Sequence, residues 1–309
     1  MRIAVMGTGG VGGYFGGRLA AGGADVSFIA RGAHLAAIRA NGLRVRSDLG
    51  DVHVANARAT DSPAEIGPVD VVLFAPKLYD CESAAEAAKP LVGPATAVIS
   101  VLNGVDAADR LGPILGPGHV CGGVVYISAA IAEPGVIAHY GRNAQMAFGE
   151  LDGRPSERLK RFAAACEKAG VDAKLRDDIQ WWIWSKFAML APMSAATATM
   201  RQAIGPIRSD PDGRRLLGDA VAEVVAVAKA RGVDLGDDAV ERTMKNVDAL
   251  PASMKASMLF DLERGNRLEV EWLSGAVWRL GREAGLETPV HRVAYAALKP
   301  FAAGAPRPA

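Results

Sequence analysis

The sequence predicts an α/β domain over residues 1–178 followed by an all-α domain over residues 179–309. Three observations support this division. The first residues have the pattern of a strand, a glycine-rich turn and a helix. Short apolar runs then alternate with helical or loop segments as far as Asp178, which is typical of a doubly wound parallel sheet. From Ile179 onward the sequence contains long helical patterns and no convincing strand.

The first predicted element is a strand over Ile3–Met6, and the segment "GTGGVG" that follows it opens a helix. This order matches a dinucleotide-binding fingerprint of the Rossmann type. Its glycines allow a sharp turn, a close approach of the backbone to a pyrophosphate, and tight packing of helix on strand. Backbone amides at the start of the helix would face the phosphates. The predicted cofactor-binding residues are therefore Gly7, Thr8, Gly9, Gly10, Val11 and Gly12.

The second predicted strand, Val26–Ala30, is followed by Arg31. NAD-binding versions of the fingerprint carry an acidic residue at about this position, roughly 20 residues beyond the glycines, whereas an arginine accommodates a 2′-phosphate. A guanidinium grips a phosphate with two parallel hydrogen bonds, and a carboxylate repels it. Arg31 therefore predicts NADP(H) as the cofactor. The alternative is a solvated arginine of a surface loop.

Three more apolar runs, beginning at Val69, Thr96 and His119, continue the predicted sheet, and ligands of such sheets lie at the carboxyl ends of the strands. The segments "GVIAHYG" and "AQMAFGE", separated by Arg142 and Asn143, predict an antiparallel hairpin. The next segment, "SERLKRFAAACEKAG", predicts an amphipathic helix capped by its first serine and ended by its last glycine.

Two helices are most clearly marked in the second half. One has Asp210 as the capping residue, Pro211 in its first turn and Gly232 at its end. The other is "LEVEWLSGAVWRLGREAG", which ends at Gly285. We expect residues 302–309 to form a frayed tail.

Composition excludes several classes of protein. The formal charge is +1 and no basic stripe stands out, so nucleic acid is not an expected partner. The dispersed Cys81, Cys121 and Cys166 favour reduced thiols over disulfides or zinc ligation, and the histidines form no metal-binding grouping. Neither a cleavable leader nor an apolar run of ~18 residues is evident. A cytoplasmic protein without a membrane segment is expected.

Four residues are candidates for chemistry in a cleft between the sheet edge and the helical half. Lys77 and Asn103 each follow a predicted strand, where a nucleotide would lie, although either could be a solvated turn residue. Lys186 lies in the apolar segment "WWIWSKFAMLAPMS", and Glu269 lies in "GNRLEVEWLSG". A buried charge is costly unless it has a partner or a task; the alternative for both is a side chain that reaches the surface.

These segments, "GTGGVGG" with "ARG", "PKLYD", "LNG", "WSKF" and "SMLFDLERGNRLEVEWLSG", resemble the ketopantoate reductase (2-dehydropantoate 2-reductase) family over nearly the whole chain. The resemblance implies a Rossmann domain joined to an all-α domain like the C-terminal domain of 6-phosphogluconate dehydrogenase. It also implies reduction of ketopantoate to pantoate with NADPH, a step of pantothenate biosynthesis.

The resemblance further implies roles for individual residues. Lys186 would be the general acid that protonates the carbonyl oxygen as hydride arrives, Glu269 would hydrogen-bond the substrate, and Ser257 would help to hold its carboxylate. Lys77 and Asn103 would line the cofactor and substrate site. The chemistry is consistent, because an ammonium stabilises the negative charge that develops on the carbonyl oxygen and then delivers the proton. A nearby carboxylate would keep that lysine charged until transfer.

One departure concerns the substrate. The family places asparagines about one and about two helical turns beyond the catalytic lysine, in contact with substrate, but this chain has Leu190 and Ser194 there. Such a pocket is less polar, and it loses selectivity for a substrate hydroxyl. Alternatives therefore remain open: a reductase or dehydrogenase for a different, less polar 2-oxo acid, or an NADP(H)-sensing protein without turnover. Apolar helices in the second half also allow a homodimer.

Overall fold

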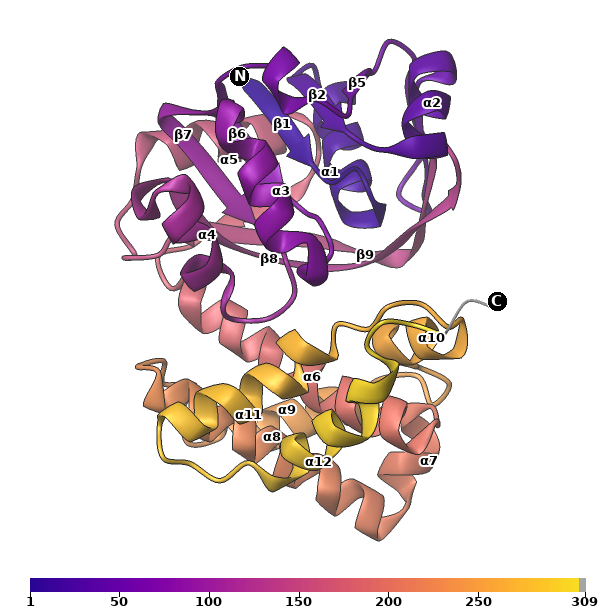
Figure 1. Cartoon of the computed structure of the whole chain (residues 1–309), viewed down its shortest axis with the longest axis vertical. Helices are drawn as coiled ribbons and strands as arrows, with labels where there is room; N and C mark the ends of the chain where they lie inside the picture. Colours follow the sequence, from indigo (N-terminus) through magenta and orange to yellow (C-terminus); the bar gives the residue numbers. More distant parts are fainter. Residues whose placement is uncertain (306–309) are drawn as a thin grey trace. The chain divides into compact units, whose positions relative to one another are not determined.

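The computed structural model describes residues 1–305 and separates into two compact units (Figure 1). The first unit comprises residues 1–102 and 107–179, and the second comprises residues 103–106 and the chain from Gln180 onward. The short segment Asn103–Asp106 therefore packs with the second unit, although both of its flanks belong to the first. The sequence had indicated a single change of character near Asp178.

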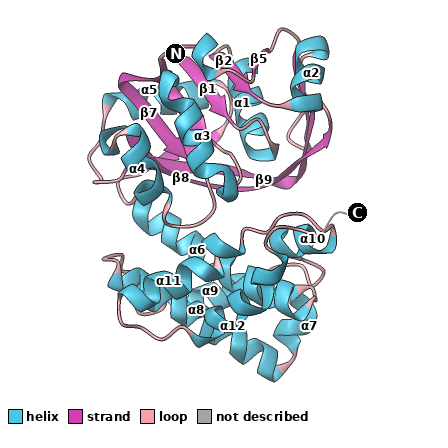
Figure 2. Ribbon diagram, viewed as in Figure 1, coloured by secondary structure: helices cyan, strands magenta, loops and turns pink. Residues whose placement is uncertain are grey.

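The first unit contains one mixed sheet with helices (Figure 2). Its strands run in the order β4-β3-β9-β8-β7-β6-β1-β2-β5, and β10 pairs with β9. Neighbours from β8 to β5 are parallel, whereas β8 with β9 and β3 with β4 are antiparallel. The predicted fold class, an α/β Rossmann-type domain joined to an all-α domain, is confirmed. The strands are β1 (Arg2–Met6), β2 (Asp25–Ile29), β3 (Leu43–Arg46), β4 (Val52–Val54), β5 (Arg58–Thr60), β6 (Val69–Phe74), β7 (Val92–Ser100), β8 (Val120–Glu133), β9 (Val136–Glu150) and β10 (Asp172–Leu175).

The predicted hairpin around Arg142 and Asn143 is wrong. Both flanking segments belong to the single strand β9, whose antiparallel partner is β8, and the chain reverses at Pro134 and Gly135 instead. Residues 140–143 form a bulge, because all of them lie on β9 opposite the single residue Ser128 of β8. The exposed polar residues thus mark an interruption of pairing rather than a reversal.

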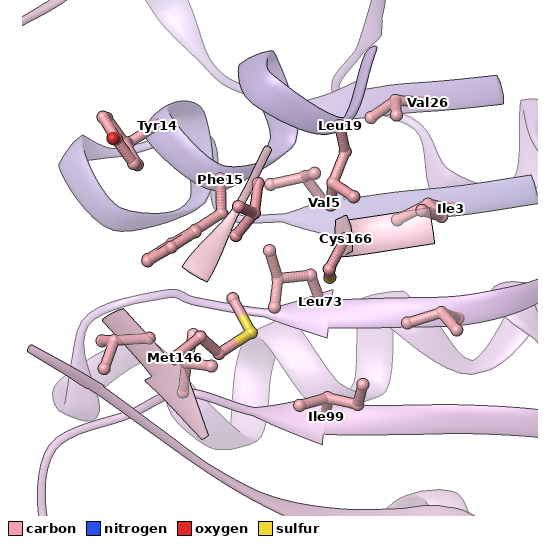
Figure 3. Close-up of a cluster of buried hydrophobic side chains, with 14 of the residues drawn as sticks. Ile3, Val5, Tyr14, Phe15, Leu19, Val26, Leu73, Ile99, Met146 and Cys166 are labelled. Carbon is pink, nitrogen blue, oxygen red and sulfur yellow. The ribbon is translucent and has the colours of Figure 1, made fainter. Parts of the chain in front are cut away.

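The first helix, α1 (Gly10–Ala21), lies inside the curve of this sheet. It contacts β1, β2, β3, β4, β6, β8 and β9, so the sheet curls around it. Phe15 and Leu19 of α1 are fully buried and lie close to Val5 of β1 (Figure 3). The remaining helices of the unit are α2 (Gly32–Asn41), α3 (Cys81–Ala88), α4 (Ala107–Leu115) and α5 (Glu157–Lys168), the last capped by Ser156 as predicted.

Within its described residues, the second unit has helices and no strand (Figure 2). Asp210 caps its helix by accepting a hydrogen bond from the Gly213 amide at 2.7 Å, and Gly232 follows the helix with positive φ, as the sequence predicted. The helices are α6 (Ile179–Met200), α7 (Ile204–Ser209), α8 (Pro211–Ala230), α9 (Ala239–Asp248), α10 (Ser257–Glu263), α11 (Ser274–Glu283) and α12 (Pro289–Leu298).

Two predictions for the second unit need correction. The helix expected from Leu268 is shorter, because α11 begins only at Ser274 and Val270–Trp272 forms a separate 3₁₀ turn. Residues 302–305 are not frayed: the Leu268 amide donates to the Ala302 carbonyl, and the Ala305 amide donates to the Gly265 carbonyl. Residues 306–309 of the expected tail lie outside the described residues.

Two further observations bear on the composition. The three cysteines are buried free thiols, and burial raises the pKa of Cys121 and that of Cys166 to about 12. They are therefore poor nucleophiles. Across residues 1–305, no helix combines the length and apolar character needed to cross a bilayer.

Candidate active site

The glycine-rich turn joins the end of β1 to the start of α1. Gly7 adopts φ of +97°, a conformation that favours glycine, and a Cβ at Gly12 would lie 2.3 Å from the Gly7 carbonyl oxygen. The hydroxyl of Thr8 donates to the Ile29 carbonyl at 2.9 Å, which ties the turn to the end of β2. By contrast, a Cβ at Gly9 would meet no atom within 4 Å. The turn is thus held to β2, and the open space beside Gly9 could receive a pyrophosphate.

Two cations of the first unit follow strands of the same sheet. Arg31 comes directly after the loop that leaves β2 and is the N-terminal flanking residue of α2. Lys77 follows β6 and precedes a short 3₁₀ turn. Both residues are exposed. The two strands are parallel and both pair with β1, so both cations follow carboxyl ends of neighbouring strands, which is the position that the sequence predicted for them.

Lys186 projects from α6 in the second unit. Its ammonium donates a hydrogen bond to the Asn103 side-chain oxygen at 2.9 Å. Burial lowers the pKa of Lys186 to about 8, and the charge of Glu269 opposes this shift. Neighbouring residues Trp184 and Phe187 anchor the helix in the hydrophobic core, which fixes the position of the lysine stem.

Glu269 is 6% exposed and stands directly before the 3₁₀ turn Val270–Trp272. It does not lie on α11, because that helix starts at Ser274. Its negative charge nevertheless acts on Lys186, where it opposes the effect of burial on the pKa. The second unit thus places Asn103 in hydrogen-bond contact with Lys186, and Glu269 influences the same lysine electrostatically. Such a group could combine a half-buried proton donor, an acceptor that orients it and a carboxylate that favours its charged form.

The other predicted substrate-binding residues differ in their surroundings. Leu190 lies about one turn beyond Lys186 on α6 and is half-buried. Ser194 lies a further turn along and is fully buried, and its hydroxyl has no hydrogen-bond partner among residues 1–305. Burying a hydroxyl without a hydrogen-bond partner costs free energy. A hydrogen bond between a ligand and the Ser194 hydroxyl would offset that cost. Ser257 is exposed at the first residue of α10.

One pair beside this group was missed by the sequence reasoning. Asp106 accepts a hydrogen bond from the Arg279 guanidinium at 2.8 Å. The Asp106 side chain is 5% exposed. A hint was available, since Asp106 follows Asn103 within the same short segment. Nothing in the sequence pointed to Arg279 as its partner.

Among residues 1–305, no group of three or more His, Cys, Asp or Glu side chains could hold a metal ion.

Comparison with known proteins gives matches over nearly the whole chain. The family model "Ketopantoate reductase PanE/ApbA" matches residues 3–153, and "Ketopantoate reductase PanE/ApbA C terminal" matches residues 178–302. A 2-dehydropantoate 2-reductase of Mesorhizobium japonicum is 36% identical, over 94% of this chain and 94% of its own length.

Solved structures agree with these matches. The 2-dehydropantoate 2-reductase of Geobacter metallireducens superposes with a TM-score of 0.90 at 30% identity, covering 97% of this chain and 99% of that one. A D-mandelate dehydrogenase solved with NADH and anilino(oxo)acetate has a TM-score of 0.87 at 21% identity, over 97% and 98% of the two chains, and shares the fold. Because the two family models together cover most of both units, the chain belongs to the ketopantoate reductase family.

Proposed function

We propose that this protein reduces ketopantoate (2-dehydropantoate) to pantoate, with NADPH as the reductant. The observation that carries the proposal is the half-buried Lys186 ammonium, hydrogen-bonded to Asn103 and influenced by Glu269. A lysine whose pKa is lowered to about 8 is a proton donor suited to neutral pH. Family membership and the identity to named reductases support the same substrate.

The first unit would bind the cofactor. The amides from Gly9 to Gly12 and the space beside Gly9 would receive the pyrophosphate, and Arg31 would pair with the 2′-phosphate. When bound, NADPH supplies the hydride that adds to the carbonyl carbon of the substrate. Lys77, which follows a neighbouring strand, would add positive charge for the phosphates or the substrate carboxylate.

The second unit would supply the proton. As hydride adds to carbon, the carbonyl oxygen gains negative charge, and the Lys186 ammonium stabilises that charge and transfers one proton to it. The 2-oxo acid thus gains a hydride at its carbonyl carbon and a proton at its carbonyl oxygen. Lys186 is left as a neutral amine that regains its proton from water. Asn103 orients the amine through its 2.9 Å hydrogen bond. Glu269 would favour the charged form of Lys186 and hydrogen-bond the substrate.

A second candidate substrate is a 2-oxo acid with a less polar side chain. Leu190 offers no hydrogen bond, and Ser194 offers only one hydroxyl where the family places amides. A site that recognises a substrate hydroxyl rejects the analogue without it by about 10⁴-fold, whereas an apolar pocket discriminates by only about 10²-fold. The preference for or against a hydroxyl is therefore diagnostic.

The decisive assay compares ketopantoate with 3,3-dimethyl-2-oxobutanoate, which differs only by lacking the hydroxyl. We expect NADPH oxidation with both acids and a larger kcat/KM for ketopantoate. In Leu190→Asn, the preference for ketopantoate should rise further, since the added amide can bond the hydroxyl. A larger kcat/KM for the analogue would favour the second candidate. If neither acid, nor a wider panel of 2-oxo acids, is reduced, the chain is not a 2-oxo acid reductase.

The assembly and location of the protein also remain proposals. We infer a cytoplasmic enzyme that forms a homodimer without membrane or nucleic acid partners. Exposed Leu216 and Val293 on the helical unit support self-association. Light scattering after size-exclusion chromatography measures the mass directly; a single species at 32.2 kDa would contradict the dimer.

A further inference from the structure

The segment Asn103–Asp106 connects two elements of the first unit but packs with the second. It follows β7 and precedes α4, and the residues on either side, Leu102 and Ala107, belong to the first unit. Its contacts with the helical unit therefore help to hold the side chain of Asn103 in place.

Both ends of this segment are bonded to helices. At one end, Asn103 accepts the hydrogen bond from Lys186 of α6 at 2.9 Å. At the other end, Asp106 accepts a hydrogen bond from Arg279 of α11 at 2.8 Å. Between them, Val105 packs against the hydrophobic core of the second unit. Gly104 has φ of +93°, so the turn adopts a conformation suited to glycine.

The Asp106 carboxylate is unusual for a loop because it is buried. Its side chain is 5% exposed, whereas that of Arg279 is 44% exposed. Removing a carboxylate from water costs several kcal/mol, and a close cationic partner offsets that cost. Loss of Arg279 would therefore favour a shift of Asp106, and with it of the segment that also carries Asn103.

We propose that Asp106 and Arg279 form a positioning pair, which holds the segment so that Asn103 orients the Lys186 amine for proton transfer. This inference rests on the proposed function of Lys186. The pair touches neither the reacting atoms nor the amine in this scheme; it acts through Asn103. Misplacement of a reacting group by about 1 Å can lower a rate by on the order of 10²-fold, even when the altered residue is remote from the chemistry.

The first test uses Arg279→Met and Asp106→Asn, with Arg282→Met as the matched control. Arg282 is an exposed arginine on the same helix, and it lies over the Trp278 ring. Because Arg279→Met leaves a buried carboxylate without this cationic partner, Tm is measured for each variant beside kcat. We expect both test variants to lower kcat by on the order of 10-fold. The control should stay within about 2-fold of the wild-type protein, and Arg279→Lys should recover part of the loss.

The second test combines Arg279→Met with Asn103→Ala. If the pair acts through Asn103, Arg279→Met should change kcat little in a protein that already carries Asn103→Ala. Equal fold-losses from Arg279→Met in the presence and absence of Asn103 would overturn the proposal. So would a variant that lowers Tm but retains the wild-type kcat, since that result describes a purely structural ion pair.

A third measurement needs no turnover. The pKa of Lys186 can be obtained from the pH dependence of its acylation by acetic anhydride, followed by mass spectrometry. Loss of the hydrogen bond to Asn103 destabilises the ammonium, so Arg279→Met and Asn103→Ala should each lower the pKa of Lys186. If the shift occurs in a protein that reduces no 2-oxo acid, the reductase proposal fails and the positioning pair stands. If turnover is normal but neither the pKa shift of Lys186 nor the coupling between Arg279 and Asn103 is observed, only the positioning-pair proposal fails.

Discussion

Lys186 is the residue on which the proposed chemistry depends. Two opposing influences set its pKa: burial disfavours the ammonium, and the negative charge of Glu269 favours it. Burial is the larger, which brings the pKa down from 10.5 to about 8. An arginine at this position would remain protonated at all working pH values and could not donate in the same way.

The pH dependence of the reaction follows from this pKa. Above pH 8 the folded protein loses the proton that it must donate, so kcat/KM for reduction should fall about tenfold per pH unit as the pH rises past that value. The reverse oxidation needs the neutral amine and should rise over the same interval. Initial rates in both directions between pH 6 and pH 10 measure this. A rate of reduction that stays constant up to pH 10 would mean that Lys186 is not the acid.

Arg31 determines the predicted choice of cofactor. Arg31→Asp replaces the guanidinium proposed to bind the 2′-phosphate by a carboxylate that can bond ribose hydroxyls, so the ratio of kcat/KM for NADPH to that for NADH should reverse. Arg39→Asp is the matched control, because it makes the same change of charge near the other end of α2. The phosphate assignment would be abandoned if the Arg31 variant kept the original NADPH preference.

At the scale of elements, α1 is more constrained than a helix that covers one face of a sheet. The curled sheet surrounds it, and close packing explains glycines that the nucleotide fingerprint alone does not require. A Cβ at Gly13 would lie 2.7 Å from Ile137, and one at Gly16 would lie 2.6 Å from Val5. These glycines allow the strands to approach the helix from several sides.

Two glycine-to-alanine substitutions test this interpretation. In Gly12→Ala the new Cβ would meet the Gly7 carbonyl oxygen at 2.3 Å, so the turn must shift. We expect a loss of about 1–3 kcal/mol in the free energy of unfolding and weaker NADPH binding. Gly218→Ala is the control: it lies within α8 with no atom within 4 Å, and alanine should stabilise that helix by about 0.5–1 kcal/mol. Urea unfolding of both variants would refute the account if Gly12→Ala were equally stabilising.

The sequence predicted long or strongly marked elements better than short ones. Most residues of β1, β2 and β6 are apolar and buried, which is the pattern expected of central parallel strands. Strands of three or four residues such as β4 and β5 carry too few positions to show a period. The reversal before β9 was missed although Pro134 and Gly135 form a typical turn pair. Exposed Arg142 and Asn143 gave a competing signal, and only strand pairing distinguishes a bulge from a turn.

At the scale of the whole molecule, the two units carry different parts of the proposed reaction. The fingerprint and Arg31 belong to the first unit, and Lys186 and Glu269 belong to the second. The candidate residues could be chosen from the sequence because of their place at strand ends, their apolar surroundings and the family resemblance. The pairing of Asp106 with Arg279 could not, because it joins residues 173 positions apart and leaves no local pattern.

This division of roles predicts that chemistry and cofactor binding can be separated by one substitution. Removal of the Lys186 amine should leave the cofactor-binding residues of the first unit unchanged. Conversely, changes at the fingerprint should weaken NADPH binding first. The chain from Gln180 onward would then contribute to rate far more than to affinity for the cofactor.

The most direct measurement is the turnover of Lys186→Ala with ketopantoate, made alongside its Kd for NADPH. The account predicts that kcat falls by about 10²–10⁴-fold, the usual contribution of a general acid, while the Kd stays within about 2-fold of the wild-type value. A Lys186→Ala protein that turned over ketopantoate at a rate near that of the wild-type protein would contradict the proposed role of Lys186 and the mechanism built on it.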